Sequence, residues 1–354
     1  MPLHAHKEVP RYFDHLSSMQ ISERRYAVQR NEPYDIIIIG GGPAGLSAGL
    51  YAMRAAMKTA LIEKGSFGGQ VSLTKEVENY LGFEEIGGIE LSDKFLRHTE
   101  SYGLEVIREE AVAVEPGFEL HSVRLANGEA LYAHAVILAA GGTPRRLGVP
   151  GEKRFFGRGV SYCAKCDGLF FKDQTVVVVG GGDTAAEEAA YLTKIARQVH
   201  MVNLESTLQA SRILQQRLLS ACNIQIHANT TVVEIRGNDQ TVSEVLLSSL
   251  KTGKRWELQA EGVFVFIGLS PNNILVPAGI RMSAGGYVIT NERRETDIPG
   301  IYVVGDLRRK YASQIAIAVS DGCIAALAAA QYVEMKKEEE KTACPYRPEL
   351  RVAV

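Results

Sequence analysis

The stretch IIIIGGGPAGLSAGLYA, residues 36–52, joins four isoleucines, a cluster of glycines and a run of small helix-forming residues. This order predicts a buried strand, a tight turn and the start of a helix, which together open a nucleotide-binding βαβ unit. A second apolar strand is expected at 59–62. Glu63 ends it, where a carboxylate can accept a hydrogen bond from a ribose hydroxyl. The strand, the glycines and the acid together predict a dinucleotide-binding site.

The same pattern returns 140 residues later as VVVVGGGDTAAEEAAYL, residues 176–192, followed by an apolar strand at 199–202. Each copy leads into a hairpin-like region, with turns at Asn127-Gly128 and Thr252-Gly253. The repeat predicts an α/β fold of two Rossmann-like dinucleotide-binding domains, each a three-layer ββα structure, with the second domain inserted into the first.

A third segment, 300–306, again runs from an apolar strand to a glycine, and a small-residue helix is expected from 314 to 335. The expected division has four parts: an N-terminal arm at 1–33, a first dinucleotide-binding domain in two segments at 34–147 and 279–340, a second dinucleotide-binding domain at 148–278, and a C-terminal tail at 341–354.

The glycines of each turn have separate tasks in this type of site. In the first copy, Gly40 permits the turn, Gly42 lets the backbone approach a pyrophosphate, and Gly45 allows the helix to pack closely on its strand. The helix N-terminus then faces the phosphates. The second copy has Gly180, Gly182 and Ala185 at these positions.

The acidic position differs between the two copies. Glu63 corresponds to Asn203, and Glu205 lies two residues further on. Because this position reads the adenosine ribose, the two clefts are expected to bind different dinucleotides. One FAD and one nicotinamide nucleotide is the simplest assignment.

Two of the five cysteines form a CxxC motif, Cys163-Ala-Lys-Cys166, with Asp167-Gly168 directly after it. A zinc site would need two further ligands at comparable spacing, and there is no second CxxC. A CxxC beside nucleotide-binding folds instead predicts a redox dithiol, which exchanges two electrons as a flavin does. Asp167 is positioned in the chain to exchange the proton, although an Asp-Gly pair is also typical of a simple turn.

Composition excludes several classes of protein. The chain has 354 residues, which suggests about two domains. Its 39 Lys and Arg against 41 Asp and Glu give no basic excess for nucleic acid. Apolar stretches such as 135–140 are too short to span a membrane, and the N-terminus has no secretory pattern. A cytoplasmic location is therefore expected.

The motifs together resemble the low-molecular-weight thioredoxin reductases over about residues 34–335. The matching segments are GGGPAG (40–45), GGQ (68–70), EVENY (76–80), AAG (139–141), YCAKCDG (162–168), GGGDTAAEEA (180–189), FIGLSPN (266–272), GIYVVGD (300–306) and SQIAIAVSDG (313–322). The resemblance implies a homodimer in which an FAD-binding domain is formed by 34–147 and 279–340, and an NAD(P)H-binding domain at 148–278 carries the CxxC disulfide. It also implies that the two domains rotate relative to each other. One orientation brings Cys166 beside the flavin, and the other exposes Cys163 to thioredoxin.

The resemblance also implies a role for individual residues. Cys163 would attack the substrate disulfide, Cys166 would exchange electrons with the flavin, and Asp167 would donate the proton. The implied FAD contacts are Gly40, Gly42, Pro43, Ala44, Gly45, Glu63, Gly69, Gln70, Asn79, Ala140, Gly141, Gly305, Asp306, Gln314 and Ile315. The implied contacts of the nicotinamide nucleotide are Gly180, Gly182, Asp183, Thr184, Ala185, Asn203, Glu205 and Gly268.

The sequence departs from this family at two places. Many relatives grip the NADPH 2′-phosphate with an HRRxxxR run, and residues 203–209 here read NLESTLQ. All three cations are absent and Glu205 would repel a phosphate, so NADH is preferred over NADPH unless Arg197 or Arg212 compensates. Ser313 stands where relatives often have arginine, which implies one FAD phosphate contact fewer.

Three alternatives use the same fold. A protein donor such as ferredoxin could replace the nicotinamide nucleotide, although the intact second glycine turn argues against it. The protein could instead be a dithiol oxidase that passes electrons to oxygen, or a flavin-containing redox sensor. The intact CAKCDG motif favours turnover over sensing.

The remaining features are expected to be structural. The N-terminal arm with His4, His6 and His15 is expected to be mobile or to pack in a dimer, with a metal role as the alternative, and Cys344 is expected to be inert. The basic cluster 308–310 is expected to be solvated loop charge, with a phosphate or acidic-partner contact as the alternative.

Overall fold

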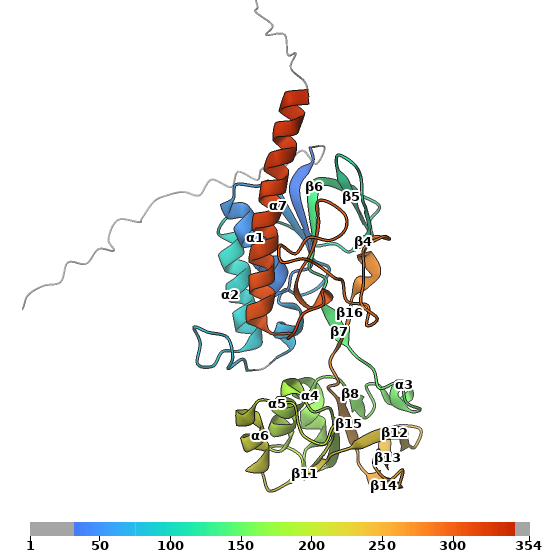
Figure 1. Cartoon of the computed structure of the whole chain (residues 1–354). Helices are drawn as coiled ribbons and strands as arrows, with labels where there is room; N and C mark the ends of the chain where they lie inside the picture. The colour runs from blue at the N-terminus through green and yellow to red at the C-terminus, as the bar shows by residue number, and fades with distance from the viewer. Residues whose placement is uncertain (1–31, 75, 344–354) are drawn as a thin grey trace, which may run out of the picture. The chain divides into compact units, whose positions relative to one another are not determined.

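The structure is a computed structural model that describes residues 32–74 and 76–343. The expectations for the histidines of the N-terminal arm and for Cys344 lie outside these residues. Within them the chain forms two main sheets, a seven-stranded mixed sheet and a five-stranded parallel sheet, each with helices on one face and antiparallel strands packed on the other (Figure 1). The predicted α/β fold with two Rossmann-like domains is confirmed.

The first sheet has the strand order β3-β2-β1-β6-β5-β4, with β17 also paired to β6. Its parallel part contains β1, β2, β3, β6 and β17; β5 pairs antiparallel with β6, and β4 pairs antiparallel with β5. The strands are β1 (Tyr34–Ile39), β2 (Thr59–Ile62), β3 (Glu105–Ile107), β4 (Ala111–Glu115), β5 (His121–Leu125), β6 (Ala130–Leu138) and β17 (Ile301–Val303).

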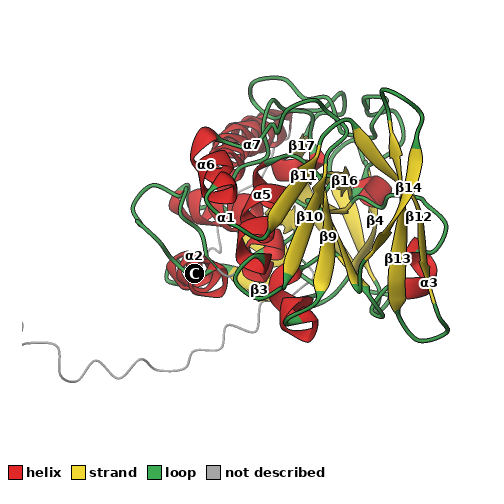
Figure 2. Cartoon of the chain, turned by 90° about the horizontal axis from the view of Figure 1, so that it is seen from below, coloured by secondary structure: helices red, strands yellow, loops and turns green. Residues whose placement is uncertain are grey.

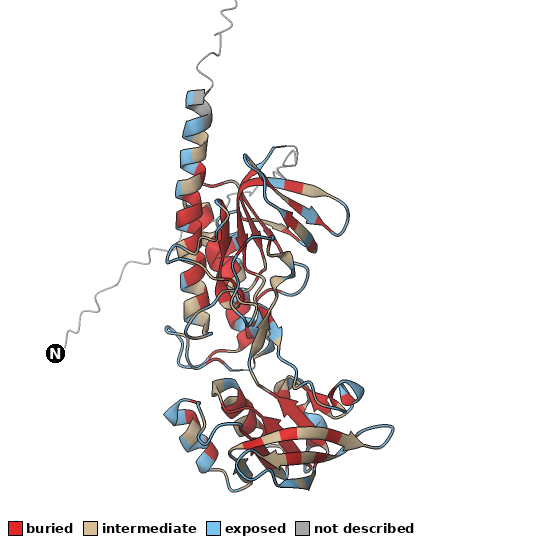
Figure 3. Ribbon diagram, turned by 45° about the vertical axis from the view of Figure 1, so that its right-hand side comes forward, coloured by how far each residue is buried: buried red, intermediate tan, exposed pale blue. Residues whose placement is uncertain are grey.

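The isoleucines of β1 divide between the two faces of this sheet. Ile36 and Ile38 pack among the helices α1 (Pro43–Arg54) and α7 (Ile315–Ala343), and Ile37 and Ile39 pack among residues of β4 and β5. Because both faces are covered, all of β1 is buried, which explains its continuous apolar run. Figure 3 shows this buried core between its layers. Helix α2 (Gly88–Glu100) lies beside α1.

The second sheet repeats this design on a smaller scale (Figure 2). Its order is β11-β10-β9-β15-β8, all parallel. Val176 and Val178 face the helices, and Val177 and Val179 face a three-stranded antiparallel sheet. The elements are β8 (Val160–Ser161), β9 (Thr175–Val179), β10 (Gln198–Val202), β11 (Ile224–His227), β15 (Gly262–Val265), α4 (Ala164–Asp167), α5 (Asp183–Leu192), α6 (Arg212–Leu219), β12 (Thr230–Gly237), β13 (Val242–Ser249) and β14 (Arg255–Gln259).

The chain leaves the first sheet and returns to it through one two-stranded ribbon. Strands β7 (Gly142–Pro144) and β16 (Leu269–Pro271) pair antiparallel, so the second sheet is an insertion, as the repeat predicts. Asn272 fastens the ribbon to the first sheet, because its amide Nδ2 donates to the Ala140 carbonyl at 2.8 Å. The strands of the second sheet fall inside 148–278; the boundary residues themselves stay a prediction.

The remaining elements are short. They are α3 (Glu152–Phe155) and the 3₁₀ turns η1 (Gly69–Leu73), η2 (Gly168–Phe171), η3 (Asn273–Leu275) and η4 (Gly305–Leu307).

Helix α7 extends to Ala343 through the charged run that follows Met335, a run that is typical of the solvated end of a helix. Among the described residues, the part of this helix at 315–339 is long and apolar enough to cross a membrane. The expectation from the sequence rested on shorter apolar stretches and did not identify this segment. The face with Ala325, Ala329 and Val333 is nevertheless fully buried in the first core. Helix α1 approaches α7 so closely that a Cβ on Gly322 would lie 2.0 Å from the Ala44 carbonyl oxygen. These contacts are those of a core helix.

Candidate redox and nucleotide-binding sites

Four segments predicted to bind the first dinucleotide meet at one edge of the first sheet. Strands β1, β2, β6 and β17 are parallel, so their carboxyl ends share this edge. The edge therefore carries the glycine turn 40–45, Glu63, the segment 139–141 and the segment 305–306. Contacts join them directly, because a Cβ on Gly40 would lie 2.4 Å from the Ala139 carbonyl oxygen and one on Gly305 would lie 3.1 Å from Ala44 Cβ.

The glycine turn leaves room where a phosphate is expected and none where the helix packs. A Cβ on Gly45 would lie 1.8 Å from the Gly40 carbonyl oxygen, so only glycine fits there. A Cβ on Gly42 would have nothing within 4 Å. Gly42 is the N-cap of α1, and no side chain caps the helix, so the N–H groups of its first turn are available to an anion. Pro43 and Ala44 form the first turn of this helix.

Glu63 is tied to this turn through both carboxylate oxygens. Oε2 accepts from the Gly41 N–H at 2.7 Å, and Oε1 accepts from the Gly65 N–H at 2.7 Å. The carboxylate is thereby fixed beside the glycines, and each oxygen keeps a lone pair for a ribose hydroxyl. This geometry suits the ribose-binding role that the sequence predicts.

The other predicted contacts of the first site come from three separate loops. Gly69 lies over the turn, with its Cβ position 3.6 Å from Gly42 Cα. Gln70 Nε2 donates to the Gly142 carbonyl at 3.2 Å, next to Gly141. Asn79 Nδ2 donates to Gln314 Oε1 at 3.4 Å, which brings Asn79 to the start of α7 and to Ile315. The fold therefore places Gly69 at the turn, Gln70 beside the segment 139–141 and Asn79 at the start of α7.

The expectation that the basic cluster 308–310 is solvated loop charge is wrong for Arg308 and Lys310, whereas Arg309 is exposed. Arg308 forms two bonds with Asp321, Nε–Oδ2 at 2.7 Å and Nη2–Oδ1 at 2.9 Å, and Asp321 is fully buried. Asp321 Oδ2 also accepts from the Gly305 N–H at 3.1 Å. Lys310 is nearly buried and pairs with Asp306 at 2.7 Å. These charges fix the turn that carries Asp306.

The second glycine turn has the same design. A Cβ on Gly182 would have nothing within 4 Å, and Gly182 is the N-cap of α5, again without a side-chain cap. Asp183 and the exposed Thr184 open the helix, and Ala185 is buried against the turn. Asp183 Oδ1 accepts from the Ser211 N–H at 2.6 Å. Gly268 lies further along the chain from β15, where its carbonyl accepts from the Arg145 N–H.

Asn203 closes the loop that follows β10 over this turn. Its amide Nδ2 donates to the carbonyls of Glu205 at 3.0 Å and Thr207 at 2.8 Å. The loop returns to the turn, because Gln209 N–H donates to the Gly181 carbonyl at 2.8 Å. Glu205 itself is exposed on the loop. Asn203 thus has a structural task beside its predicted contact with the nucleotide, and Glu205 presents the free carboxylate.

One proposed substitute for the missing cations is placed at the wrong end of the sheet. Arg197 Nη2 donates to Thr175 Oγ1 at 3.0 Å, at the amino end of β9, whereas the glycine turn follows its carboxyl end. Arg197 is therefore not a candidate for a 2′-phosphate contact. Arg212 directly follows Ser211, which is bonded to Asp183, so it remains beside the second turn.

Two histidines under this site predict an acid-sensitive fold. His200 Nδ1 and His227 Nε2 lie 3.1 Å apart on β10 and β11, and burial lowers the pKa of both. The unfolded chain binds these protons from about pH 6.5 downward, so stability is lost as the pH falls from there through the lowered folded pKa. Replacing His227 by glutamine is expected to reduce the fall in melting temperature between about pH 7.5 and about pH 5. Thermal melts at both pH values measure it.

The matched control for that experiment is His98→Gln, at an exposed position on α2. This variant is expected to show the same fall in melting temperature between the two pH values as wild type. An equal loss in wild type and in the His227 variant would contradict the prediction.

The CxxC motif forms a disulfide, with the Cα atoms of Cys163 and Cys166 5.4 Å apart. Cys163 is the N-cap of α4, and its Sγ accepts from the Cys166 N–H at 3.2 Å. Such an N–H group favours the thiolate form of Cys163 after reduction. Cys166 is exposed and Cys163 is half-buried; Asp167 is half-buried at the end of the same helix. The separate roles of the two cysteines stay a prediction.

Sequence reasoning missed two charged residues beside the disulfide. Glu188 on α5 accepts from the Ala164 N–H and pairs with Lys165, and these are the two residues between the cysteines. The repeat contains a signal for this site, because Glu188 corresponds to Ala48 at an offset of 140 residues. A charged residue at a position that is apolar and buried in the other copy indicates a specific partner.

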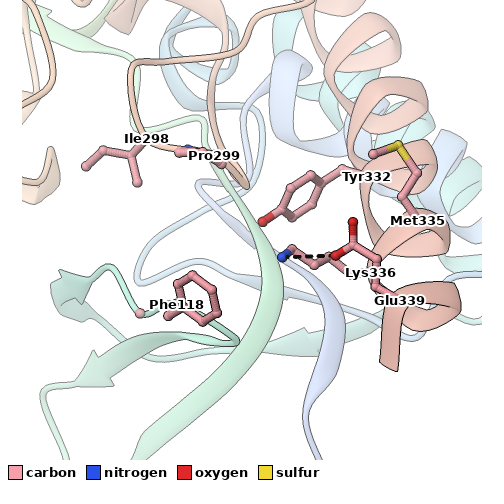
Figure 4. A pocket seen from close by; sticks show the side chains of 8 residues that line it. Phe118, Ile298, Pro299, Tyr332, Met335, Lys336 and Glu339 are labelled. Carbon is pink, nitrogen blue, oxygen red and sulfur yellow. Dashed lines mark ion pairs between the residues drawn. The ribbon is translucent and has the colours of Figure 1, made fainter. Parts of the chain in front are cut away.

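A separate pocket of about 310 Å³ lies beside α7 (Figure 4). It is lined by Gly117, Phe118, Ile298, Pro299, Tyr332, Met335, Lys336 and Glu339. Lys336 and Glu339 pair at 3.4 Å across one turn of the helix. The pocket shares no residue with either glycine turn or with the disulfide.

Two uncapped glycine turns and an adjacent disulfide define a class of protein, the dinucleotide-dependent disulfide oxidoreductases. The family model described as pyridine nucleotide-disulphide oxidoreductase matches residues 34–322. The thioredoxin reductase of Bacillus subtilis is 44% identical over 310 residues, which cover 87% of this chain and 98% of that protein. The thioredoxin reductase of Treponema pallidum is 40% identical and covers 85% of this chain and 97% of that protein.

Solved structures agree with these relatives. The thioredoxin reductase of Lactococcus lactis superposes with a TM-score of 0.83 at 39% identity, covering 85% of this chain and 99% of that one. The enzyme of T. acidophilum gives a TM-score of 0.80 at 33% identity, covering 86% and 99%. The chain belongs to the pyridine nucleotide-disulphide oxidoreductases and, within them, to the low-molecular-weight thioredoxin reductases, which are FAD-dependent thioredoxin-disulfide reductases.

Proposed function

We propose that this protein moves two electrons from NADH, through bound FAD and the Cys163–Cys166 disulfide, to oxidised thioredoxin. The observation that carries the proposal is the CxxC disulfide held against α5, the helix that begins at the second glycine turn. This arrangement puts a dithiol on a nucleotide-binding domain, as the family resemblance implies. We propose that the protein acts as a homodimer in the cytoplasm.

The first site suits FAD. The space over Gly42 and the uncapped start of α1 fit a pyrophosphate, and the fixed Glu63 carboxylate fits a ribose. Asp306, held by Lys310, and the start of α7 complete the site from the other side. Bound FAD would supply two-electron transfer between the nicotinamide and the disulfide. The N-terminus of α7 would favour negative charge on the reduced ring.

The second site suits NADH better than NADPH. A 2′-phosphate is expected near the loop 203–209, where Glu205 presents an exposed carboxylate and the HRRxxxR cations are absent. A carboxylate repels a phosphate dianion and accepts a hydrogen bond from a free 2′-hydroxyl. Arg212 is the remaining cation next to this turn, and NADPH use would assign the contact to it.

Thiol chemistry at the motif follows from the two sulfurs. Reduction adds two electrons and two protons to the disulfide and frees both thiols. The Cys163 thiolate then attacks one sulfur of the thioredoxin disulfide, and the other sulfur leaves as a thiolate that takes up a proton. Cys166 attacks Cys163 in the mixed disulfide, which restores the Cys163–Cys166 bond and releases reduced thioredoxin. Asp167, at the end of α4, is proposed to exchange the proton.

An apolar surface next to the disulfide suits a protein substrate. Leu169 and Phe170, directly after the CAKCDG motif, are 68% and 77% exposed. Large exposed apolar side chains beside a reactive group are typical of a docking site for a partner protein. We propose that thioredoxin contacts them when its disulfide meets Cys163.

A coupled assay tests the proposed function. Oxidised thioredoxin, insulin and the purified holoenzyme are mixed with NADH, and the loss of NADH absorbance is followed. The proposal expects turnover that depends on thioredoxin. Turnover with reduced ferredoxin instead of a nucleotide would favour the protein-donor alternative, and oxygen consumption with dithiols but no nucleotide would favour the oxidase.

A pair of glycine variants tests the FAD site separately from catalysis. Gly42→Ala places a methyl group in the open space over the turn, so it is expected to fold normally and to lower FAD affinity by about tenfold or more. Gly45→Ala forces a Cβ against the Gly40 carbonyl and is expected to cost about 1–3 kcal/mol of stability.

Fluorescence titration of the apoprotein with FAD measures the FAD affinity, and thermal melts without FAD measure the stability. Wild-type FAD affinity in Gly42→Ala would place the pyrophosphate elsewhere.

A further inference from the structure

Lys165, one of the two residues between the cysteines, makes a buried ion pair. Lys165 Nζ lies 3.5 Å from Glu188 Oε1, and the two side chains are only 11% and 10% exposed. Glu188 Oε2 accepts from the Ala164 N–H at 3.1 Å, and Ala164 is fully buried. Both carboxylate oxygens of one α5 residue are thus engaged by two successive residues of the CxxC helix.

Glu188 occupies a position that packing alone would give to an apolar residue. Its neighbours on the buried face of α5 are Ala185, Ala189 and Leu192, and the first glycine-turn helix has Ala48 at the equivalent place. Burial raises the pKa of Glu188, and the Lys165 ammonium opposes this shift. A buried charge at such a position is costly unless its partners compensate it.

We propose that Glu188 is a positioning residue for the disulfide: it fastens the CxxC helix α4 to the nucleotide-binding helix α5, and it neutralises Lys165 so that the disulfide keeps a low reduction potential. The inference rests on the redox role proposed above for Cys163 and Cys166. Its claim is narrower, because it concerns only the equilibrium between the disulfide and the dithiol.

The expected change in reduction potential depends on whether a nearby cation stabilises the disulfide or the dithiol form of Cys163 and Cys166. A free ammonium beside the cysteines favours a thiolate, which stabilises the reduced form and raises the potential. Lys165 belongs to the same short helix as Cys166, and Glu188 engages its ammonium. Removing the carboxylate therefore makes the disulfide easier to reduce. Removing the ammonium leaves a carboxylate that opposes a thiolate, and it makes the disulfide harder to reduce.

Glu187 supplies a matched control on the same helix. It is half-buried, its pKa is raised by burial and lowered by Lys165, and Asp183 and Glu188 repel its charge. Glu187 feels the same ammonium, but the bonds to Ala164 and Lys165 belong to its neighbour. Glu187→Gln therefore removes one negative charge at an adjacent position without releasing α4.

The test is a charge cycle of Glu188→Gln, Lys165→Gln and the double variant. Each holoenzyme is equilibrated in dithiothreitol redox buffers, and the reduced fraction of Cys163 and Cys166 is measured by alkylation and mass spectrometry. Glu188→Gln is expected to raise the equilibrium constant for reduction about tenfold, which is about 30 mV for a two-electron couple. Lys165→Gln is expected to lower this equilibrium constant. The double variant is expected to return to within about twofold of the wild-type value. Glu187→Gln is expected to stay within the same range.

The proposal is supported if the two single variants shift the equilibrium constant for reduction in opposite directions and the double variant restores it. The proposal is overturned if both single variants shift this constant in the same direction, if the constant does not change, or if the double variant fails to return toward wild type. A purely structural contact would not make the two charge changes cancel. If one single variant fails to fold, the double variant and the other single variant still give the comparison. The measurement needs neither nucleotide nor thioredoxin, so failure of the proposed function would be seen separately in the coupled assay.

Discussion

Replacing Cys163 by serine is expected to abolish thioredoxin reduction while leaving reduction of the flavin by its nucleotide intact. Without Cys163 the Cys163–Cys166 disulfide cannot form, and a serine hydroxyl cannot replace a thiolate in disulfide exchange. The value of kcat/KM for thioredoxin is expected to fall on the order of 10³-fold or more. The two halves of the reaction are measured separately, by the coupled assay and by anaerobic bleaching of the flavin absorbance.

The control is Cys222→Ser, which removes an exposed free cysteine outside the motif and is expected to leave both rates unchanged. Disulfide turnover that survives in the Cys163 variant would show that another sulfur attacks thioredoxin. The mechanism proposed for the motif would then be wrong.

The second large effect concerns the choice of nucleotide. Replacing Leu204 and Glu205 by arginine puts two cations on the loop where many relatives have them. Each charge-assisted hydrogen bond to the 2′-phosphate is worth about 1.5–3 kcal/mol. The ratio of kcat/KM for NADPH to that for NADH is therefore expected to rise about 10²-fold or more. Steady-state kinetics with both nucleotides measure the ratio.

A charge control separates this contact from general attraction. Gln240→Arg adds a cation in the exposed turn between β12 and β13 and is expected to leave the ratio unchanged. A wild-type enzyme that already prefers NADPH would contradict the interpretation of Glu205. The contact would then be sought at Arg212, because Arg197 is bonded at the other end of β9.

The sequence predicted those parts of the fold that depend on neighbouring residues. The strand, turn and helix of each glycine motif appear where they were expected, because β-branched runs and small residues favour these structures locally. Helix α7 likewise continues through the charged run after Met335, because lysine and glutamate favour a helix.

Contacts between distant segments could not be predicted in the same way. Arg308 is adjacent to other basic residues and suggests a solvated loop, but the fold brings the buried Asp321 to it from α7. The sequence of α5 shows that Glu188 interrupts an apolar helix face, but it does not show what the carboxylate contacts. Its partner Lys165 lies 23 residues earlier in the chain. Only the repeat, through Ala48, marks the position as unusual.

Anaerobic stopped-flow with the purified holoenzyme tests the central claim most directly. The oxidised enzyme is mixed with NADH or NADPH, the flavin absorbance is followed, and oxidised thioredoxin is then added. The account predicts fast bleaching with NADH, slow bleaching with NADPH, and recovery of the absorbance on addition of thioredoxin. Absence of bleaching with both nucleotides would contradict it and would leave a protein donor, with reduced ferredoxin as the next reagent to test.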